Sequence, residues 1–367
     1  MDDRHNEELR RLASENNPKP RRPLSEYIIS QAELSEQNIP PRKYLLGQWM
    51  PLDSFGMLVA PRGIGKSWFC MFLAHAIASG RNRFLGWDIN QKFPVLYVDG
   101  EMSKADIKER FDSLCEYKLD NLFLLCSEML YQDGRPLCLD SKEDQNAITE
   151  ALTDLEAKGS RPQLIVLDNL STLRRGINEN DNSEASELID WLIKLRHLGY
   201  TILVVHHSGK NGTPRGASIL EVPMDFILEL KKPDTKALKA VGETHFDFKF
   251  SKVRQKMPQP GELELSMRTD DHGYFTLIYQ TQEKDIKPYY RVLRVIAENG
   301  KSIYDDISSK AGVSKGSVAK HLKTLSDYGF LEGMSIEQRI SLKGRTMLHE
   351  IWPHLFKLPV QDEDLPF

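Results

Sequence analysis

The stretch FGMLVAPRGIGKSW, residues 55–68, decides the fold class of this 367-residue chain. Its first six residues are apolar without alternation, which is typical of a strand buried on both faces of a parallel sheet. Residues 60–67 then fit the pattern A/G-x4-G-K-S/T, with Ala60 in the first position. The residues from Trp68 to Ser79 predict a helix that stops at Gly80. A strand, a Gly-rich turn and a helix in this order predict a phosphate-binding loop.

Two glycines, one lysine and one serine explain the chemistry of this loop. Gly63 and Gly65 let the backbone curl so that several N–H groups face one point, and the following helix adds the positive end of its dipole. Lys66 can place a positive charge on the β- and γ-phosphates, and the Ser67 hydroxyl can reach Mg²⁺. We therefore predict ATP and Mg²⁺ as cofactors, with nucleotide contacts from Ala60, Pro61, Arg62, Gly63, Ile64, Gly65, Lys66, Ser67 and Trp68.

Two further apolar strands end in carboxylates. The run QLIVLD ends in Asp168, which can hold Mg²⁺ through water. The next residue, Asn169, is either a hydrogen-bonding neighbour of the site or a simple strand cap. In the run VLYVDGEMS, Glu101 can orient and activate the attacking water. Asp99 is the alternative, and we favour Glu101 because Gly100 frees the backbone to turn the glutamate into the site.

The rest of the chain predicts an α/β core followed by a smaller domain. Continuous apolar runs separated by helical patterns indicate a doubly wound, mostly parallel sheet, and the alternating runs after Lys231 indicate antiparallel strands at one sheet edge. The apolar runs are 55–60, 95–100, 164–169, 201–206 and 225–230, and the alternating ones are 245–254 and 261–267. Residues 273–279 are rich in strand-forming residues and belong to the same edge. We predict a flexible tail (1–25), an arm or linker (26–50), the core (51–281), a second domain (286–355) and a tail (356–367).

The order of these parts resembles the RecA/DnaB class of ATPases. Within that class, VVHHSGKNGTPRGAS (204–218) is similar to the RepA-type hexameric plasmid helicases and their phage relatives, and the resemblance covers about residues 45–280. It implies a RecA-like P-loop ATPase core that hydrolyses ATP. It also implies that His207, which ends the fourth strand, senses the γ-phosphate, whereas His206 would point to the other side of the strand. The alternative is that both histidines are ordinary strand-tip residues.

The same resemblance suggests residues for subunit and DNA contacts. The run FKFSKVRQ resembles a K-x-R element that crosses the subunit interface to the neighbour's γ-phosphate, and it is carried over as Lys252 and Arg254. An exposed basic edge pair is the alternative. The polar stretch after the Asp168 strand and the Gly-rich loop after His207 match the DNA loops of the class. Their candidate phosphate contacts are Arg174, Arg175, Lys210 and Arg215, although solvated loops explain them equally well and Arg215 could instead reach a neighbouring subunit.

The C-terminal region resembles a winged helix. Helical patterns at 288–300, at 302–312 and after Ser314 are followed by RISLKGRTMLHEI (339–351), which we expect to form a wing-like strand. Residues 286–355 hold eleven Lys/Arg and seven Asp/Glu, a net charge of +4, against −4 for the whole chain. DNA contact is favoured over protein docking. The expected contacts along the second helix of the helix–turn–helix, the one after Ser314, are Lys315, Ser317, Lys320 and Lys323.

The amino-acid composition limits the class of protein and the compartment in which it works. Hydrophobic residues make up 40% and charged residues 28%, which excludes a disordered or collagen-like chain, and the four scattered cysteines favour a reducing cytoplasm. The sequence has no run of about 18 apolar residues, so we predict no membrane-spanning helix. We expect an ATP-dependent DNA helicase that forms a ring, as a homo-oligomer and specifically a hexamer, in replication of a plasmid, phage or other mobile element. The alternatives are a DNA-binding ATPase without unwinding activity and an ATP-switched DNA-binding regulator.

Overall fold

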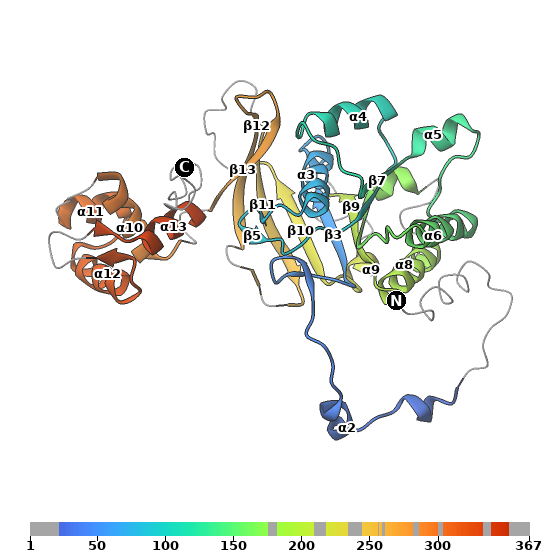
Figure 1. Ribbon diagram of the computed structural model, residues 1–367, viewed down its shortest axis with the longest axis horizontal. Helices are drawn as coiled ribbons and strands as arrows, with labels where there is room; N and C mark the ends of the chain where they lie inside the picture. The colour runs from blue at the N-terminus through green and yellow to red at the C-terminus, as the bar shows by residue number, and fades with distance from the viewer. Residues whose placement is uncertain are drawn as a thin grey trace, which may run out of the picture. The chain divides into compact units, whose positions relative to one another are not determined.

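The apolar and alternating runs assemble into one sheet of nine strands in the order β13-β12-β11-β10-β3-β9-β8-β6-β7 (Figure 1). The six strands from β10 to β7 are parallel, and β11 pairs antiparallel with β12. The strands are β3 (Phe55–Ala60), β6 (Val95–Asp99), β7 (Leu122–Cys126), β8 (Leu164–Asp168), β9 (Thr201–His207), β10 (Phe226–Lys231), β11 (Thr244–Val253), β12 (Glu262–Thr269) and β13 (Phe275–Thr281). This is the expected fold class, a mostly parallel sheet with an antiparallel edge, as in RecA-like P-loop ATPase cores.

The structure is a computed structural model that describes residues 22–174, 182–208, 218–233, 244–255, 257–258, 261–281, 286–299, 304–332 and 339–351. Two compact units are distinguished, one made of Met1–Lys232, Phe250–Pro258 and Thr269–Thr276, the other of Pro233–Lys249, Gln259–Arg268 and Leu277–Phe367. No helix among the described residues is both long and apolar enough to cross a bilayer.

Helices connect the parallel strands of the first unit. They are α3 (Lys66–Ser79), α4 (Lys104–Asp112), α5 (Ser127–Gln132), α6 (Lys142–Ala157), α7 (Leu170–Leu173), α8 (Asn182–His197) and α9 (Ser218–Glu221). The helix predicted from Trp68 begins two residues earlier, at Lys66, and ends at Gly80, whose φ of +67° is the left-handed conformation of a helix C-cap.

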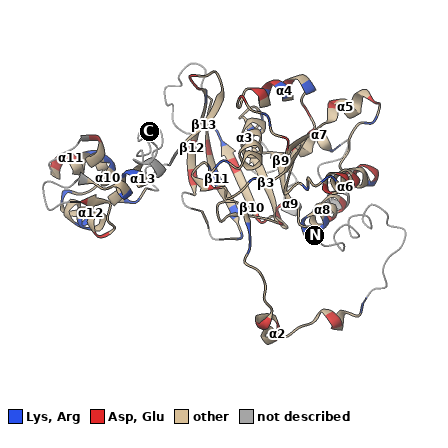
Figure 2. Cartoon of the chain, in the orientation of Figure 1, with Lys and Arg blue, Asp and Glu red and all other residues tan. Residues whose placement is uncertain are grey.

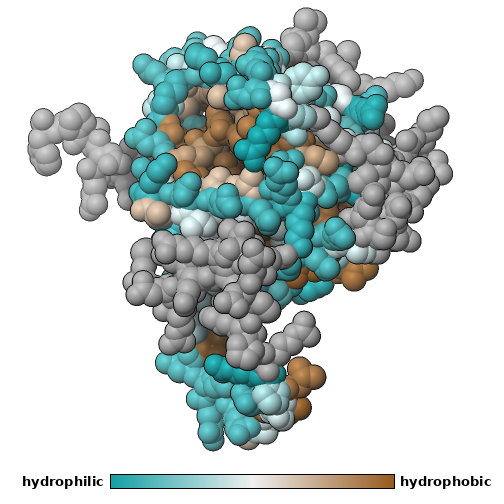
Figure 3. All heavy atoms as spheres, turned by 90° about the vertical axis from the view of Figure 1, so that its right-hand side faces the viewer, coloured by the Kyte–Doolittle hydropathy of each residue, from teal (hydrophilic) through white to brown (hydrophobic). Residues whose placement is uncertain are grey.

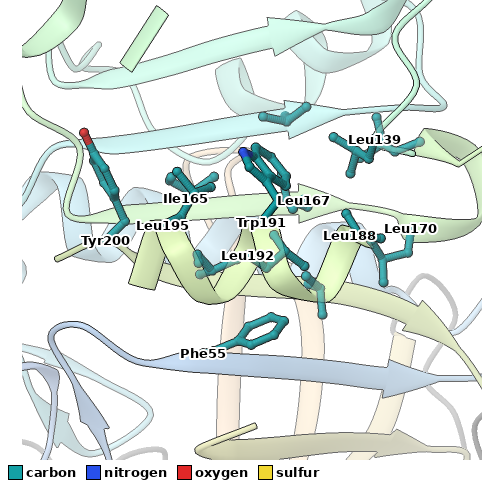
Figure 4. Packing of buried hydrophobic residues seen from close by; sticks show 14 of the residues in the cluster. Phe55, Leu139, Ile165, Leu167, Leu170, Leu188, Trp191, Leu192, Leu195 and Tyr200 are labelled. Carbon is teal, nitrogen blue, oxygen red and sulfur yellow. The ribbon is translucent and has the colours of Figure 1, made fainter. Parts of the chain in front are cut away.

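Helix α8 supplies much of the core. Leu188, Trp191, Leu192 and Leu195 recur at helical spacing, and all four pack into the buried cluster beside Phe55 and residues of β8 (Figure 4). Burying each such side chain contributes roughly 1.5–3 kcal/mol to stability. Helix α8 therefore buries apolar side chains along the length of the parallel strands.

An aromatic cluster anchors the start of the core. The small hairpin β1 (Tyr44–Leu46) and β2 (Met50–Pro51) carries Trp49, whose ring lies edge-on to Trp87, Phe226 and Phe250 at centroid distances of 5.4, 5.2 and 4.8 Å. Residue 56 must be glycine here, because a Cβ would lie 2.1 Å from the Phe226 ring. The hairpin β4 (Arg83–Phe84) and β5 (Trp87–Asp88) lies alongside. The chain that precedes β1 therefore joins the core next to strands β10 and β11.

Residues 22–43 precede this anchor. They contain a short 3-10 helix, η1 (Leu24–Tyr27), and α2 (Gln31–Glu36), and neither has a buried residue. Helix α2 begins with a complete capping box, in which Ser30 and Glu33 exchange side-chain-to-backbone hydrogen bonds of 3.1 and 2.6 Å.

The C-terminal part of the second unit has its own core of eleven buried residues among the described ones, between Ile286 and Leu348. Its elements are α10 (Pro288–Asn299), α11 (Tyr304–Ala311), α12 (Lys315–Asp327), β14 (Leu331–Glu332), β15 (Arg339–Ile340) and α13 (Leu342–Ile351), with β14 antiparallel to β15.

The wing-like strand predicted for 339–351 is wrong beyond Ile340, because the stretch continues as α13. Ser341 starts this helix, and its Oγ accepts the N–H of Gly344 at 3.0 Å. Ser341, Gly344 and Leu348 are buried at a helical spacing of three and four residues. The strand we expected over the stretch is limited to Arg339 and Ile340, and the helical period takes over after the cap.

Candidate active site

The phosphate-binding loop follows β3, the strand between β9 and β10. Gly63 has a φ of +72° and Gly65, the N-cap of α3, has a φ of +102°. L-residues with a side chain rarely adopt these values, so both glycines are required by the shape of the loop. The loop therefore presents its backbone N–H groups at the amino end of a fourteen-residue helix, which favours an anion.

Lys66 is buried at the start of α3. Its Nζ donates hydrogen bonds to the carbonyl oxygens of Pro61 at 2.9 Å and Ala60 at 3.4 Å. Burial lowers the pKa of this ammonium, and the nearby Asp168 carboxylate opposes that shift. The loop thus holds the lysine against its own backbone, beside the predicted phosphate position.

The other loop residues differ in what they can contribute. The Ile64 side chain is buried in the core, so only its backbone can face a ligand. The Trp68 ring stacks edge-on with Phe275 at 4.9 Å, and the Arg110 guanidinium lies 5.2 Å from its centroid. Arg62 is exposed at the tip of the loop.

Asp168 is buried at the carboxyl end of β8 and has two hydroxyl partners. The Tyr97 hydroxyl donates to its Oδ2 at 2.5 Å, and the Ser67 side chain also hydrogen bonds to it. Burial raises the pKa of Asp168, and both hydroxyl groups act in the opposite direction. A serine hydroxyl and a carboxylate that lie together at the start of α3 match the oxygen ligands of Mg²⁺, so the residues fit this ion.

Tyr97 was missed by the sequence analysis, although a signal for it exists. Strands β6 and β8 pair in register, with Asp99 opposite Asp168 and Tyr97 opposite Val166. Side chains two residues apart share one face of a strand, so Tyr97 and Asp168 face the same side. Once the two strands are placed side by side, the tyrosine is the nearest hydroxyl on β6.

Asp99 and Glu101 have different environments. Asp99 is buried, and its Oδ1 accepts the backbone N–H groups of Glu101 at 2.9 Å and Met102 at 2.6 Å. Burial raises its pKa to about 6. Glu101 is exposed, and its Oε2 accepts a hydrogen bond of 2.8 Å from Asn169 Nδ2. Asp99 therefore holds the turn, while Glu101 presents its carboxylate beside the loop.

Gly100 is required for a reason other than the one expected. A Cβ at this position would lie 2.6 Å from Thr172 Oγ1 and 2.7 Å from Leu173 Cγ. The Gly100 N–H donates to the Asp168 carbonyl at 2.8 Å. The close approach of α7, not backbone freedom, requires the glycine, and that approach brings Asn169 beside Glu101.

Asn169 hydrogen bonds to Glu101 and caps a helix rather than a strand. Its Oδ1 accepts the Thr172 N–H at 3.3 Å and caps α7, while its Nδ2 donates to Glu101. The residue therefore links the candidate water-positioning carboxylate to the end of the β8 strand.

The two histidines at the end of β9 are inequivalent. His206 is buried opposite Val59 of β3, whereas the half-buried His207 lies opposite Ala60, the first residue of the loop. Burial and the charges of Lys66 and Arg62 lower the pKa of His207 to about 4, so the ring is neutral near pH 7. This places a neutral imidazole next to the phosphate-binding loop.

Lys252 and Arg254 lie near the amino ends of the parallel strands, opposite the ends that carry the phosphate loop. Lys252 Nζ donates to the carbonyls of Glu221 (2.7 Å) and Val222 (3.3 Å), and Arg254 donates to Val222 at 3.0 Å and lies 3.5 Å from Asp225. Asp225 accepts the N–H of Phe55, at the amino end of β3, which is about 17 Å from the loop end of that strand. Neither residue is thus placed to reach the phosphate loop of its own chain.

The candidate DNA contacts of the core are only partly described. Arg174 is largely buried, and its Nε pairs with Asp140 Oδ1 at 2.8 Å, which argues against a phosphate contact by this side chain. Arg175, Lys210 and Arg215 lie outside the described residues.

Helix α12 of the C-terminal part presents two lysines that have no ion pair among the described residues. Val318 and Leu325 face the core, while Lys320 and Lys323 are exposed on the other side. Figure 2 marks the Lys and Arg positions of the chain in blue. The two remaining candidates are engaged locally: Lys315 pairs with Asp305 at 2.6 Å, and the Ser317 hydroxyl donates to the Ser314 carbonyl at 2.7 Å.

Comparisons with protein families and with solved structures gave matches. A family model described as the AAA domain matches residues 19–213, the range that holds the loop, Glu101, Asp168 and His207. No curated protein matches the chain significantly. Among solved structures, the flagellar accessory protein FlaH from Methanocaldococcus jannaschii is similar at 14% identity and a TM-score of 0.42, covering 62% of this chain and 90% of that one.

Proposed function

Because the chain belongs to the AAA domain family and is a P-loop ATPase, we propose that it is an ATP-dependent DNA helicase or translocase of the ring-forming RecA/DnaB class. The proposed setting is replication of a plasmid, phage or other mobile element. The observation that carries the proposal is the meeting of the phosphate loop, the Ser67–Asp168 pair and the exposed Glu101 at one sheet edge.

Each residue of this edge has a role in the proposed hydrolysis. Loop N–H groups and Lys66 bind the phosphates, and Ser67 and Asp168 hold Mg²⁺, which neutralises phosphate charge when bound. Glu101 orients the attacking water and accepts its proton. The neutral His207 senses the nucleotide state beside Ala60.

The place of Lys252 and Arg254 supports a proposed oligomer. Because neither residue is placed to reach its own loop, a role at a γ-phosphate requires a second copy of the chain. An arginine supplied in trans can accelerate hydrolysis by 10³-fold or more, on the order of the effects known for arginine fingers. We propose a homo-oligomer, and a hexamer in particular, with single-stranded DNA as the substrate of the ring.

The winged-helix assignment is also part of the proposal. Its support is the order of three helices, a short antiparallel hairpin and the solvent-facing Lys320 and Lys323 of α12. We propose that these two lysines contact DNA phosphates. The pairing of Lys315 with Asp305 leaves it a weaker candidate.

Unwinding of a forked duplex with ATP and Mg²⁺ tests the proposal, with Lys66→Ala as the matched control. Strand separation that disappears in the control supports the helicase. Hydrolysis stimulated by single-stranded DNA without strand separation would leave a DNA-dependent ATPase. Hydrolysis indifferent to DNA, together with tight binding to one duplex site, would replace the motor with an ATP-switched regulator.

A further inference from the structure

Four aromatic side chains gather at one place in the C-terminal part, where α10 begins and α12 ends (Figure 1). Tyr289 and Tyr290 belong to the first turn of α10, Tyr328 is the C-cap of α12, and Phe330 comes just before β14. Each ring contacts two others, at centroid distances of 4.5 Å (Tyr289 and Tyr290), 5.8 Å (Tyr290 and Phe330), 5.9 Å (Tyr328 and Phe330) and 5.7 Å (Tyr289 and Tyr328). The interplanar angles lie between 54° and 67°, so no pair of this aromatic cluster stacks face to face.

The cluster is held on a fixed turn. The Phe330 side chain is buried in the core of the C-terminal part. Gly329, with a φ of +73°, lets the chain turn between Tyr328 and Phe330. The Ser341 hydroxyl donates to the Gly329 carbonyl at 2.7 Å, and Lys343 Nζ donates to the Tyr328 carbonyl at 2.9 Å. The rings are therefore preorganised, and a ligand that binds them has little ordering of the protein to offset.

Tyr328 is the most exposed ring of the cluster, at 50%, whereas Phe330 is buried. A ring that served only for packing would gain more from full burial. The exposed large apolar side chains of the first unit are mostly aliphatic, and Figure 3 shows hydrophobic surface there in a hollow with a hydrophilic rim. Aromatic faces, unlike aliphatic surface, stack on planar groups. The exposed part of the cluster is therefore suited to a planar ligand.

Two lysines flank the rings. Lys287 Nζ lies 5.8 Å from the Tyr289 centroid, and Lys343 Nζ lies 5.3 Å from the Phe330 centroid. Both lysines are exposed, and neither forms an ion pair with a carboxylate among the described residues. Residues 287–291, 326–332 and 341–345 together hold four Lys/Arg and two Asp/Glu. A planar ligand that also carries negative charge fits this surface best.

We propose that the aromatic cluster stacks on the bases of single-stranded DNA, with Lys287 and Lys343 beside the adjacent phosphates. A nucleotide joins a planar base to a phosphate, which matches rings with flanking cations. Bases in a duplex stack on one another, so the surface favours single strands. This inference rests on the proposed function for the choice of DNA, but it requires no ATP hydrolysis. It adds base contacts to the phosphate contacts proposed for Lys320 and Lys323.

Binding of two labelled oligomers of equal length to the full-length chain without nucleotide tests the stacking. One is an oligothymidylate, and the other has the same backbone with abasic sites. We expect wild type to bind the oligothymidylate about fivefold more tightly or better, because stacking one base contributes roughly 1 kcal/mol or more. Tyr328→Leu keeps an apolar side chain but removes the ring, and it should lose this preference with unchanged binding of the abasic oligomer.

Three further variants make the test specific. Tyr328→Phe keeps the ring and should retain the preference for bases. Tyr304→Leu, at an exposed aromatic of α11 outside the cluster, is the matched control and should bind both oligomers like wild type. Lys287→Gln should weaken binding of both oligomers alike and reduce the salt dependence, since it removes a phosphate contact.

Equal binding of the two oligomers by wild type, or a Tyr328→Leu chain that keeps the preference for bases, would overturn the stacking surface. An equal loss in Tyr304→Leu would do the same, because the effect would not belong to the cluster. DNA-stimulated ATP hydrolysis of the same variants separates the two proposals. A preference that depends on Tyr328 in a chain whose hydrolysis ignores DNA counts only against the proposed function. Stimulated hydrolysis without that preference counts only against the stacking surface.

Discussion

At the scale of the residue, the division of labour among the carboxylates defines the candidate site. The Asp99 carboxylate accepts two backbone N–H groups of the turn that follows β6. Asp168 hydrogen bonds to the Tyr97 and Ser67 hydroxyl groups. Of the three carboxylates, Glu101 alone is exposed to solvent beside the loop. The sequence could place all three carboxylates at strand tips. It could not show which backbone N–H groups Asp99 accepts, because that depends on the turn that follows.

This division predicts different effects on ATP hydrolysis for two isosteric substitutions. Glu101→Gln should lower the kcat for ATP hydrolysis about a hundredfold or more, since it removes the proposed base, with little change in stability. Asp99→Asn should leave most of the activity, because an amide oxygen can still accept the two backbone hydrogen bonds. Steady-state hydrolysis and thermal unfolding of both variants check this. A larger loss of kcat in Asp99→Asn would reverse the assignment.

The Tyr97 hydroxyl predicts an effect on Mg²⁺-dependent binding. Tyr97→Phe removes the hydrogen bond to Asp168 and should weaken binding of the Mg²⁺–nucleotide complex about tenfold, with little change in binding without Mg²⁺. Fluorescent nucleotide titrations measure both values. Tyr200→Phe is the control, because Tyr200 is equally buried but lies just before β9, at the amino end of that strand and away from the phosphate loop. Equal losses in both variants would contradict a specific role for Tyr97.

His75 predicts a loss of stability on the acid side. Burial, followed by Arg81 and Lys118, lowers its pKa to about 4 in the folded chain, against 6.5 as the ordinary value. Below pH 6.5 the unfolded chain therefore binds more protons, so stability falls as the pH drops towards 4. His75→Gln should make this fall shallower, as measured by urea unfolding between pH 7 and 5. An unchanged pH dependence would show that His75 does not titrate this way.

At the scale of the element, the sequence was most informative where one pattern acts alone. The phosphate loop and the buried parallel strands follow from local apolar runs and from glycines that the turn requires. The C-terminal stretch after Ile340 was less predictable, because two strand-like residues precede a helix that depends on the Ser341 cap and on burial of Gly344 against Phe330. Tyr97 and the true constraint on Gly100 depend on contacts between elements, which no local pattern contains.

The packing of α7 on β6 predicts a stability difference between two glycines. Gly100→Ala should destabilise the core by about 1–3 kcal/mol, because its Cβ would meet Thr172 and Leu173. Gly316→Ala in α12 should be neutral or stabilise by up to about 1 kcal/mol, since nothing lies within 4 Å of that Cβ. Chemical denaturation of both variants provides the measurement. A tolerated Gly100→Ala would mean that α7 can shift without loss.

At the scale of the whole molecule, Lys252 and Arg254 lie near the amino end of β3, and the loop end of that strand is about 17 Å away. The proposed role of these two residues at a γ-phosphate therefore needs a second copy of the chain. The sequence indicated the K-x-R element from its pattern. It could not show the distance to the loop, because that distance depends on how β10, β11 and β3 assemble.

Stimulation of ATP hydrolysis by single-stranded DNA is the test of whether this P-loop ATPase couples its nucleotide to DNA. ATP hydrolysis by the full-length chain is followed as single-stranded DNA is added, beside Lys66→Ala. We predict that the rate rises to a plateau with DNA in the wild-type chain and stays at background in the variant. A wild-type rate that does not respond to DNA would contradict the proposed coupling, and hydrolysis that persists in Lys66→Ala would contradict the assignment of the phosphate loop.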